Sequence, residues 1–175
     1  MLFNKQSPAV TEIVANENTH YRERAVTEIN IRTTTLADAD TISEFNQLMA
    51  METENKKLPD EVIDSGVRRL MQQPEYGFYL VAEIENRTVG TCMITKEWSD
   101  WRDGLFWWVQ SVYVKKDFRK QGVYTAMYSK IQSLAATEPD VYGFRLYVEK
   151  DNVIAQKTYE SLGMKATDYL LFEAV

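Results

Sequence analysis

Cysteine, histidine and long apolar runs are scarce in this sequence, and each scarcity removes a class of protein. The 175 residues include one cysteine, Cys92, so no disulfide can form within the chain. A single histidine, His20, argues against a histidine-based catalytic triad and against a histidine-rich metal site, so we expect no metal. No uninterrupted apolar run approaches the roughly 20 residues of a membrane-spanning helix, so we expect no membrane partner.

Positive charge is also in deficit. Lys and Arg total 20 against 26 Asp and Glu, and the net charge of −6 argues against general affinity for nucleic acid. The stretch from Met1 to Pro8 lacks the basic and apolar regions of a signal peptide, which favours a cytoplasmic protein. Hydrophobic residues make up 45% of the chain, which is enough to build a folded core.

Regular apolar spacing begins at Ile29, which predicts an N-terminal arm over 1–28 and one domain over 29–175. In chain order, the pattern predicts a strand at 29–33, a helix through 42–49, a charged link at 52–58, a helix from 59 to Pro74, strands at 77–84 and 88–95, a loop at 96–104, a strand at 105–114, a helix at 122–136, a strand at 142–148, a helix at 153–162 and a final strand at 170–172.

The connection lengths predict the topology of the sheet. Strand 105–114, helix 122–136 and strand 142–148 form the one strand–helix–strand crossover of good length, which should join parallel strands with a right-handed connection. The short turn at 85–87 predicts antiparallel pairing of its two strands. The expected fold is α/β (α+β), with a mixed, mostly antiparallel sheet, helices on both faces and one parallel β-α-β crossover.

Residues 111–127 combine a buried strand, a cationic loop and the start of a helix. Four cations stand within six positions of the loop, namely Lys115, Lys116, Arg119 and Lys120, and Gly122 stands where the helix begins. Free N–H groups and the positive end of a helix dipole bind anions, and glycine permits close approach to the backbone. The residues therefore indicate a phosphate or pyrophosphate site. An ordinary solvated loop with surface lysines is the competing interpretation.

This loop and a second motif resemble a known family. The run Arg119-Lys-Gln-Gly122-Val-Tyr124 is similar to the pyrophosphate loop of the GCN5-related N-acetyltransferases (GNAT), Gln/Arg-x-x-Gly-x-Gly/Ala. The run from Asn152 to Met164 has the spacing of the family's Asn-x-x-Ala-x-x-x-Tyr-x-x-Leu-Gly-Phe signature. The two motifs lie in the family's order around a strand–helix–strand unit, and the resemblance extends from Ile29 onward. Tyr124 replaces the usual second Gly or Ala, so its ring either crowds the pyrophosphate or points away.

The resemblance implies that acetyl-CoA is the cosubstrate and that its acetyl group passes to a primary amine by direct attack in a ternary complex. It assigns the protonation of the leaving thiolate to Tyr159, for which a core aromatic is the alternative role. Asn152 is a cofactor contact, the helix N-cap, or both. The implied cofactor-binding residues are Val112, Tyr113, Val114, Arg119, Lys120, Gln121, Gly122, Val123, Tyr124 and Asn152.

The predicted loop at 96–104 offers residues for the acceptor. Glu97 and Asp100 stand beside Trp98 and Trp101, a combination that suits a cationic amine, and a carboxylate can also remove the proton of the amine. Glu97 and Asp100 are therefore catalytic candidates. The competing interpretation is a structural loop whose tryptophans cover the core. Gln110 and Glu83 are further candidates to line the site by strand position, and Cys92 is expected in the core.

Two functions from different classes remain open. The favoured one is an N-acetyltransferase whose acceptor is a small-molecule amine, with a peptide or protein amine as the alternative acceptor. The other is a catalytically degenerate module that binds CoA or another phosphate ligand. The presence of both Tyr159 and Asn152 favours the enzyme. The sequence is compatible with a homodimer but contains no signal that requires one.

Overall fold

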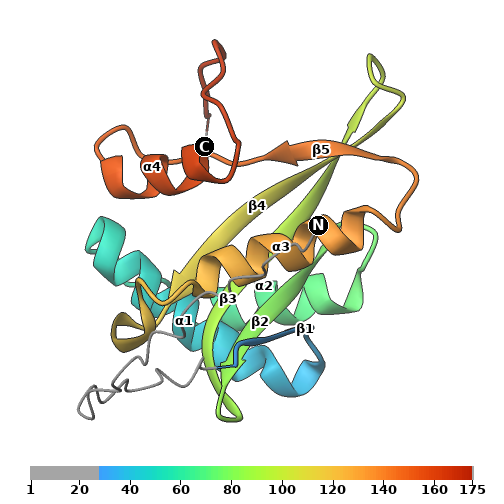
Figure 1. The fold of residues 1–175 in the computed structure, drawn as a ribbon. Coiled ribbons are helices and arrows are strands. Elements are labelled where there is room, and N and C mark those ends of the chain that lie inside the picture. Colours follow the sequence, from blue (N-terminus) through green and yellow to red (C-terminus); the bar gives the residue numbers. More distant parts are fainter. Residues whose placement is uncertain (1–27, 175) are drawn as a thin grey trace, which may run out of the picture.

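A computed structural model describes residues 28–174 as a sheet between two layers of helices (Figure 1). The order of elements is β1 (Asn30–Thr33), α1 (Ala39–Glu54), α2 (Asp60–Gln72), β2 (Gly77–Ile84), β3 (Arg87–Ser99), β4 (Gly104–Val114), α3 (Val123–Ala135), β5 (Val141–Arg145) and α4 (Val153–Ser161). Single 3₁₀ turns precede α1 at Leu36–Asp38 and α3 at Lys116–Phe118. The predicted arm at 1–28 lies almost entirely outside the described residues.

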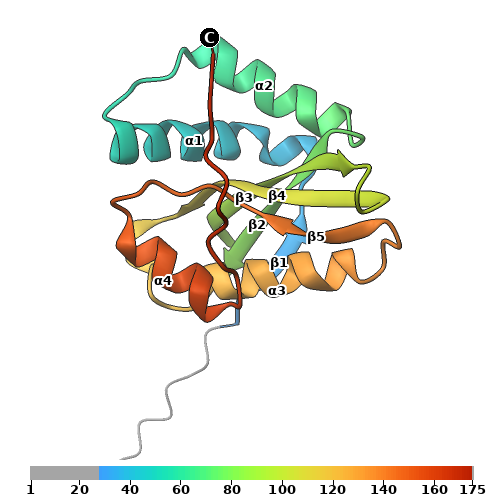
Figure 2. The same cartoon turned by 90° about the horizontal axis from the view of Figure 1, so that it is seen from above.

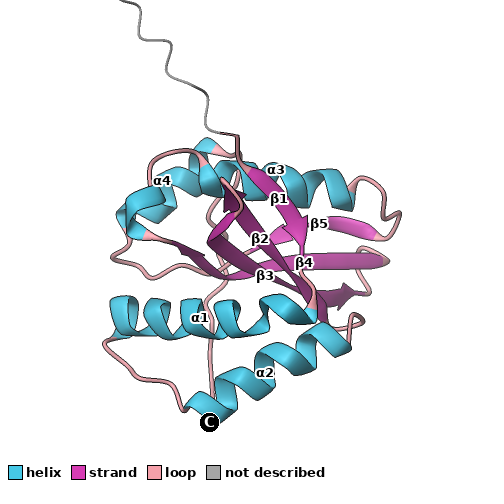
Figure 3. Ribbon diagram, turned by 90° about the horizontal axis from the view of Figure 1, so that it is seen from below, coloured by secondary structure: helices cyan, strands magenta, loops and turns pink. Residues whose placement is uncertain are grey.

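The strands lie side by side in chain order, from β1 to β5. The first four pair antiparallel, and β4 pairs parallel with β5. Helices α1 and α2 cover one face, while α3 and α4 lie on the other (Figures 2 and 3). The predicted mixed sheet with one parallel crossover is confirmed. None of the described helices is long and apolar enough to span a membrane.

The two faces of the sheet carry separate clusters of buried side chains. Leu80 and Ile94 pack with Met127 and Ile131 of α3 on one face. On the other face, Tyr79 and Val81 pack with side chains of α1 and α2. Because successive residues of a strand point to opposite faces, β2 contributes to both clusters, which explains its nearly continuous apolar sequence.

Four predicted segments differ in the structure, and one of them is the strand predicted at 142–148, which is observed only at Val141–Arg145. Helix α1 continues to Glu54 and ends at Asn55, a left-handed cap, so it takes up the first part of the expected charged link. Strand β3 continues to Ser99, which reduces the expected loop at 96–104 to the turn at 100–103. The predicted strand at 170–172 does not form, and these residues have no regular secondary structure.

The longer hairpin has a physical cause in its cross-strand pairs. Lys96 lies opposite Trp107, Glu97 opposite Phe106 and Trp98 opposite Leu105. Charged side chains at 96–97 suggested a loop, but aromatic and apolar partners on the neighbouring strand stabilise an extended pair. Glu97 and Trp98 therefore belong to a strand and point to opposite faces of the sheet.

Candidate functional site

Strands β4 and β5 pair over only part of their length. Their register runs from Leu105 opposite Val141 to Trp108 opposite Arg145 and then stops. In Figure 1 the two strands lie together at one end and diverge toward α4. From Val109 to Val114 this edge of β4 has no strand partner among the described residues, so its backbone groups can pair with an extended ligand.

A bulge in β4 accompanies the separation. Met93 lies opposite Gln110 and Thr91 opposite Tyr113, so one residue of β3 faces two of β4. Ser111 has φ of 47°, in the left-handed region that non-glycine residues rarely adopt. Such a bulge bends the strand and changes its twist. The predicted thioester-binding residues Val112, Tyr113 and Val114 follow it directly.

The loop between β4 and α3 presents free backbone donors. Lys120 and Gly122 have φ of 60° and 83°, and alternation of this kind turns successive N–H groups toward one concave surface. No described group accepts a hydrogen bond from the amides of residues 121–125. A Cβ on Gly122 would meet no protein atom within 4 Å, so the space beside it is open. This geometry fits the phosphate site that the sequence predicts.

Arg119 is engaged by protein groups in this structure. Its Nε donates to the carbonyl of Val114 at 2.7 Å, and its guanidinium pairs with Glu52 of α1 at 2.7 Å. Lys116 also approaches Glu52, at 3.6 Å. Burial opposes ionisation of Glu52, but its hydrogen bond and charge contact with Arg119 prevail and lower the pKa of its carboxyl. Arg119 thus anchors the loop to α1, whereas Lys120 forms no ion pair with a described residue.

Tyr159 belongs to α4, the helix beside the diverging strands, and Asn152 directly precedes this helix. The Asn152 side chain accepts a hydrogen bond from the Ala155 amide at 3.1 Å, so it does cap the helix. Tyr159 is partly buried, and its hydroxyl makes no hydrogen bond within the described part of the chain. Burial raises the pKa of Tyr159 above its ordinary value, which keeps the phenol protonated.

Tyr124 points into the interior and away from the loop. Its ring meets Tyr159 edge-on, with centroids 5.5 Å apart, and stacks on Tyr128. Burial raises the pKa of Tyr124, and its hydroxyl has no hydrogen-bond partner among the described residues. The large side chain at this position therefore leaves the start of α3 open. Its contact also fixes Tyr159 beside the first turn of α3.

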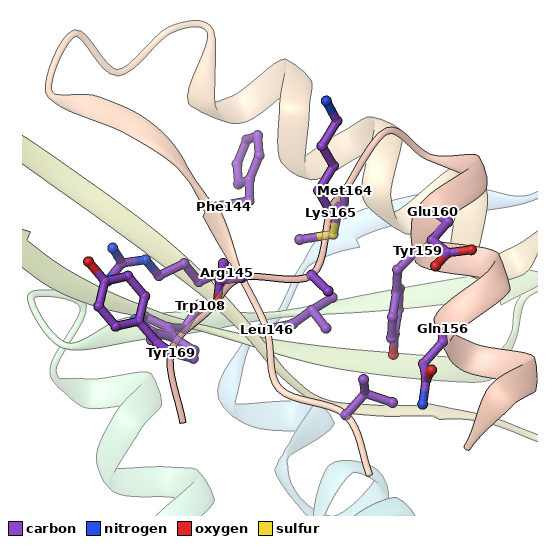
Figure 4. A pocket seen from close by; sticks show the side chains of 13 residues that line it. Trp108, Phe144, Arg145, Leu146, Gln156, Tyr159, Glu160, Met164, Lys165 and Tyr169 are labelled. Carbon is purple, nitrogen blue, oxygen red and sulfur yellow. The ribbon is translucent and has the colours of Figure 1, made fainter. Parts of the chain in front are cut away.

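A pocket of about 490 Å³ lies between the continuation of β5, α4 and residues 164–169. Figure 4 shows Tyr159 entering from one side, with Trp108, Arg145 and Tyr169 on the opposite side. The pocket thus brings a side chain of α4 and side chains of β4 and β5 around one space. Arg145 is a pocket residue that the sequence patterns did not single out as a site residue, because only the sheet register places it there.

Glu97 lies next to this pocket and forms hydrogen bonds with side chains of strands β4 and β5. Its carboxylate accepts from the indole N–H of Trp108 and, at 2.8 Å, from Arg145. Tyr147 also donates to the Gln110 amide oxygen at 3.0 Å. The charge of Glu97 is therefore already matched by a guanidinium. Gln110 is thus joined to the segment after β5 by a hydrogen bond, but it is not among the residues that line the pocket.

Asp100 and the two tryptophans lie elsewhere. Asp100 is in the turn at 100–103, about 25 Å along β4 from the bulge at Ser111. Trp101 is 85% exposed and Trp98 is 59% exposed, so neither covers the core. The expected group of Glu97, Asp100, Trp98 and Trp101 is therefore not assembled, because strand alternation and the projecting turn separate its members.

Glu83 and Cys92 serve the fold in this structure. Glu83 pairs with Arg32 of β1 at 2.7 Å, two strands away from β4. Cys92 is fully buried, and burial raises the pKa of its thiol to about 12. Within the described residues, no group of three histidine, cysteine, aspartate or glutamate side chains is arranged to hold a metal ion.

Comparisons with known proteins point to one family of enzymes. A model of the acetyltransferase (GNAT) family matches residues 40–164. Among solved structures, a possible acetyltransferase from Clostridium difficile 630 is 41% identical, with a TM-score of 0.78 over 84% of this chain and 97% of that one. No curated protein matches the chain.

Two more distant structures share the fold. Aminoglycoside N-acetyltransferase AAC(6')-Iy in complex with CoA is 16% identical, with a TM-score of 0.67, over 85% of this chain and 95% of that one. Ribosomal-protein-alanine N-acetyltransferase from Brucella melitensis biovar Abortus 2308 is 19% identical, with a TM-score of 0.68, over 85% and 99%. At these identities the similarity concerns the fold alone.

Proposed function

The chain belongs to the GNAT family of acetyltransferases, and from this premise we propose that it transfers the acetyl group of acetyl-CoA directly to a primary amine. One observation carries the proposal: a free strand edge, a loop of unpaired amides and a partly buried phenol surround the same region. The contact between Tyr124 and Tyr159 links the start of α3 to α4, and the pocket links Tyr159 to β4.

The residues of the loop and of β4 fit acetyl-CoA. The free amides of residues 121–125 and the N-terminus of α3 suit the pyrophosphate, with Lys120 adding charge. The backbone of Val112 and Val114 would pair with the extended pantetheine arm. When bound there, acetyl-CoA supplies the activated acyl group. Arg119 holds the loop in shape through Val114 and Glu52.

Tyr159 is the proposed general acid. An amine that attacks the thioester carbonyl forms the new carbon–nitrogen bond and loses a proton to solvent, while the carbon–sulfur bond breaks and the thiolate that leaves needs a proton. The Tyr159 phenol is held protonated by burial, and its hydroxyl has no competing partner among the described residues. No covalent acyl-enzyme is required. Cys92, the one cysteine, is fully buried and protonated, which also disfavours such a route.

A small-molecule amine is the proposed acceptor, ahead of a peptide or protein amine. A pocket of about 490 Å³ is within the usual range for small ligands. Its neighbourhood combines the aromatic ring of Trp108 with the polar groups of Glu97 and Arg145. Gln110 and Tyr147 add hydrogen-bonding groups beside the free edge of β4. These groups suit an acceptor that carries its own polar substituents.

The proposed function is tested by thiol release from acetyl-CoA. The purified chain is incubated with acetyl-CoA and, in turn, a polyamine, an amino acid, an aminoglycoside and a peptide with a free N-terminus. We expect thiol release that depends on the amine and rises with its concentration. Binding of acetyl-CoA without release for any amine would instead support the degenerate binding module.

Glu97→Gln should raise KM for the amine about fivefold and leave KM for acetyl-CoA unchanged. The amide keeps an oxygen for the Trp108 indole but loses the charge that holds Arg145 beside the pocket. Steady-state kinetics with each substrate varied in turn measures both constants.

The matched control is Glu85→Gln, which neutralises an exposed carboxylate in the β2–β3 turn. We expect Asp100→Asn to behave like this control, since the turn at 100–103 lies far along β4. A melting temperature that falls in Glu97→Gln while the amine kinetics stay unchanged would assign Glu97 to stability alone.

A further inference from the structure

Arg145 of β5 lines the pocket, and its neighbours hold its guanidinium in one orientation. The guanidinium lies over the ring of Phe106, with its central carbon 3.7 Å from the ring centroid. Its Nη1 donates to the Glu97 carboxylate at 2.8 Å. Trp108 lies opposite Arg145 in the parallel strand pair, and its ring centroid is 5.9 Å from the same carbon. A stacked ring and an ion pair together fix the plane of the guanidinium before any ligand arrives.

The hydrogen bonds of this cluster leave donors free for a ligand. Each oxygen of the Glu97 carboxylate already accepts a hydrogen bond, one from Arg145 and one from the Trp108 indole. The guanidinium of Arg145 carries only donors, and its bond to Glu97 is the one hydrogen bond that it makes with the described residues. Its side chain is 38% exposed, so the unused N–H groups can reach a ligand. A carboxylate, which accepts two parallel hydrogen bonds and carries the opposite charge, fits such a fork best.

The lining of the pocket is richer in positive charge than the rest of the molecule. Its charged residues are Arg145, Lys165 from the segment after α4, and Glu160, which follows Tyr159 on α4. Two cations therefore face one carboxylate, in a protein whose net charge is −6. Figure 4 shows Arg145 across the pocket from Tyr159, the phenol that should meet the thioester. An acceptor that carries an anionic group at the end distant from its amine complements this arrangement.

We propose that the acceptor is a small amine that also carries a carboxylate, and that Arg145 selects it by pairing with that carboxylate. This inference rests on the proposed acetyl transfer and names the acceptor class for the same site. Glu97 is then a positioning residue, because it orients Arg145 and does not itself contact the acceptor. The cationic amine that the acidic sequence around Glu97 suggested is not the preferred acceptor, since the charge of Glu97 is matched within the protein.

The carboxylate of the acceptor takes no part in the bond changes of the transfer. The amine nitrogen forms a bond to the acetyl carbon as the carbon–sulfur bond breaks, and the proton of the amine goes to solvent. The thiolate takes a proton from Tyr159, which regains one from solvent. The products are free CoA and an N-acetylated carboxylate. Arg145 contributes by holding the amine in place for attack, so its effect should appear mainly in KM for the acceptor.

The first experiment compares acceptors that differ only in the charge of this group. Alanine, γ-aminobutyrate, δ-aminovalerate and ε-aminocaproate are each tested against their own carboxamide by thiol release from acetyl-CoA. Rates are expressed per neutral amine, because an amide close to the amine lowers its basicity. We expect kcat/KM for the carboxylate to exceed that for the amide by about tenfold or more in at least one pair.

The outcomes separate this inference from the proposed function. Acetylation of amines with equal kcat/KM in every pair overturns the carboxylate preference and leaves the acetyltransferase in place. No thiol release with any amine, charged or neutral, overturns the acetyl transfer and the inference with it.

The second experiment assigns the preference to Arg145. Arg145→Gln should lower kcat/KM for the preferred carboxylate by about 10- to 100-fold, mainly through KM, and leave its amide and KM for acetyl-CoA unchanged. Arg145→Lys keeps the charge but not the fork, so it should recover part of the preference. Arg102→Gln is the matched control, since Arg102 also lies over a ring, that of Tyr142 at 5.0 Å, but in the turn at 100–103 and outside the pocket.

A double variant guards against a loss of stability. Arg145→Gln leaves the Glu97 carboxylate without its cation, whereas Glu97→Gln/Arg145→Gln removes both charges of the pair. We expect both variants to acetylate the carboxylate and its amide at similar rates, with the melting temperature recorded for each. A preference for the carboxylate that persists in either variant overturns the assignment to Arg145.

Discussion

Gly122→Val should lower the affinity for acetyl-CoA by about 100-fold or more, the largest loss expected from any single substitution here. Gly122 has φ of 83°, and the free amides that should hold the pyrophosphate surround it. A valine side chain would occupy the open space beside this backbone, where the phosphates must approach. Titration calorimetry measures the loss, and binding to the unchanged protein should weaken as salt rises.

Gly163→Val is the control for strain in this experiment. Gly163 has φ of 87°, and a Cβ there also meets no atom within 4 Å. In both variants a non-glycine residue must adopt a left-handed backbone, which lowers the free energy of unfolding by on the order of 1–2 kcal/mol. Only Gly122 lies in the loop between β4 and α3. We expect similar falls in melting temperature and a loss of acetyl-CoA affinity only at Gly122. Equal affinity in Gly122→Val and the unchanged protein would exclude the loop as the pyrophosphate site.

Tyr159→Phe should reduce kcat by about 10²- to 10⁴-fold with little change in acetyl-CoA affinity. The substitution keeps the ring and its edge-on contact with Tyr124, and it removes only the hydroxyl that would protonate the thiolate. Tyr128→Phe is the matched control, because Tyr128 is a buried neighbour that stacks on Tyr124 and has no proposed role in the reaction. A normal kcat in Tyr159→Phe would assign Tyr159 to packing.

The pH dependence provides a second measurement on Tyr159. A general acid must carry its proton, and burial raises the pKa of this phenol above its ordinary value near 10. The rate should therefore not fall through loss of this proton until the pH exceeds that ordinary value. Tyr159→Phe should lose this fall in rate at alkaline pH together with most of its activity. A fall in rate at alkaline pH that persists in the variant would be due to another titrating group.

The order of elements and the phosphate loop could be predicted from local patterns. Gly77–Ile84 is a strand in both the prediction and the structure, because its β-branched and aromatic residues favour extended backbone and the turn after it is short. The unpaired amides after Lys120 depend on a loop, a glycine and a helix start, all of which lie close together in the sequence. Short-range features such as these need no knowledge of distant neighbours.

The acceptor side could not be predicted in the same way. Glu97 and Asp100 are three residues apart, yet one lies in β3 beside Arg145 and the other in the hairpin turn. The partners of Glu97 come from positions 108 and 145, which only the pairing of β3, β4 and β5 brings together. Its charge is matched by a residue far away in the chain, so its environment follows from register and not from neighbouring residues.

The apolar run at 170–172 also separates what the local sequence predicts from what the tertiary structure decides. By itself the sequence determined that these residues prefer a strand, since side-chain type is a local property. Whether a strand forms depends on a free edge that can supply its hydrogen bonds, and this is a property of the assembled sheet. Only the tertiary structure shows β5 as an open edge with the segment lying away from it. Local preference selects the kind of element, and long-range pairing decides where its partners are.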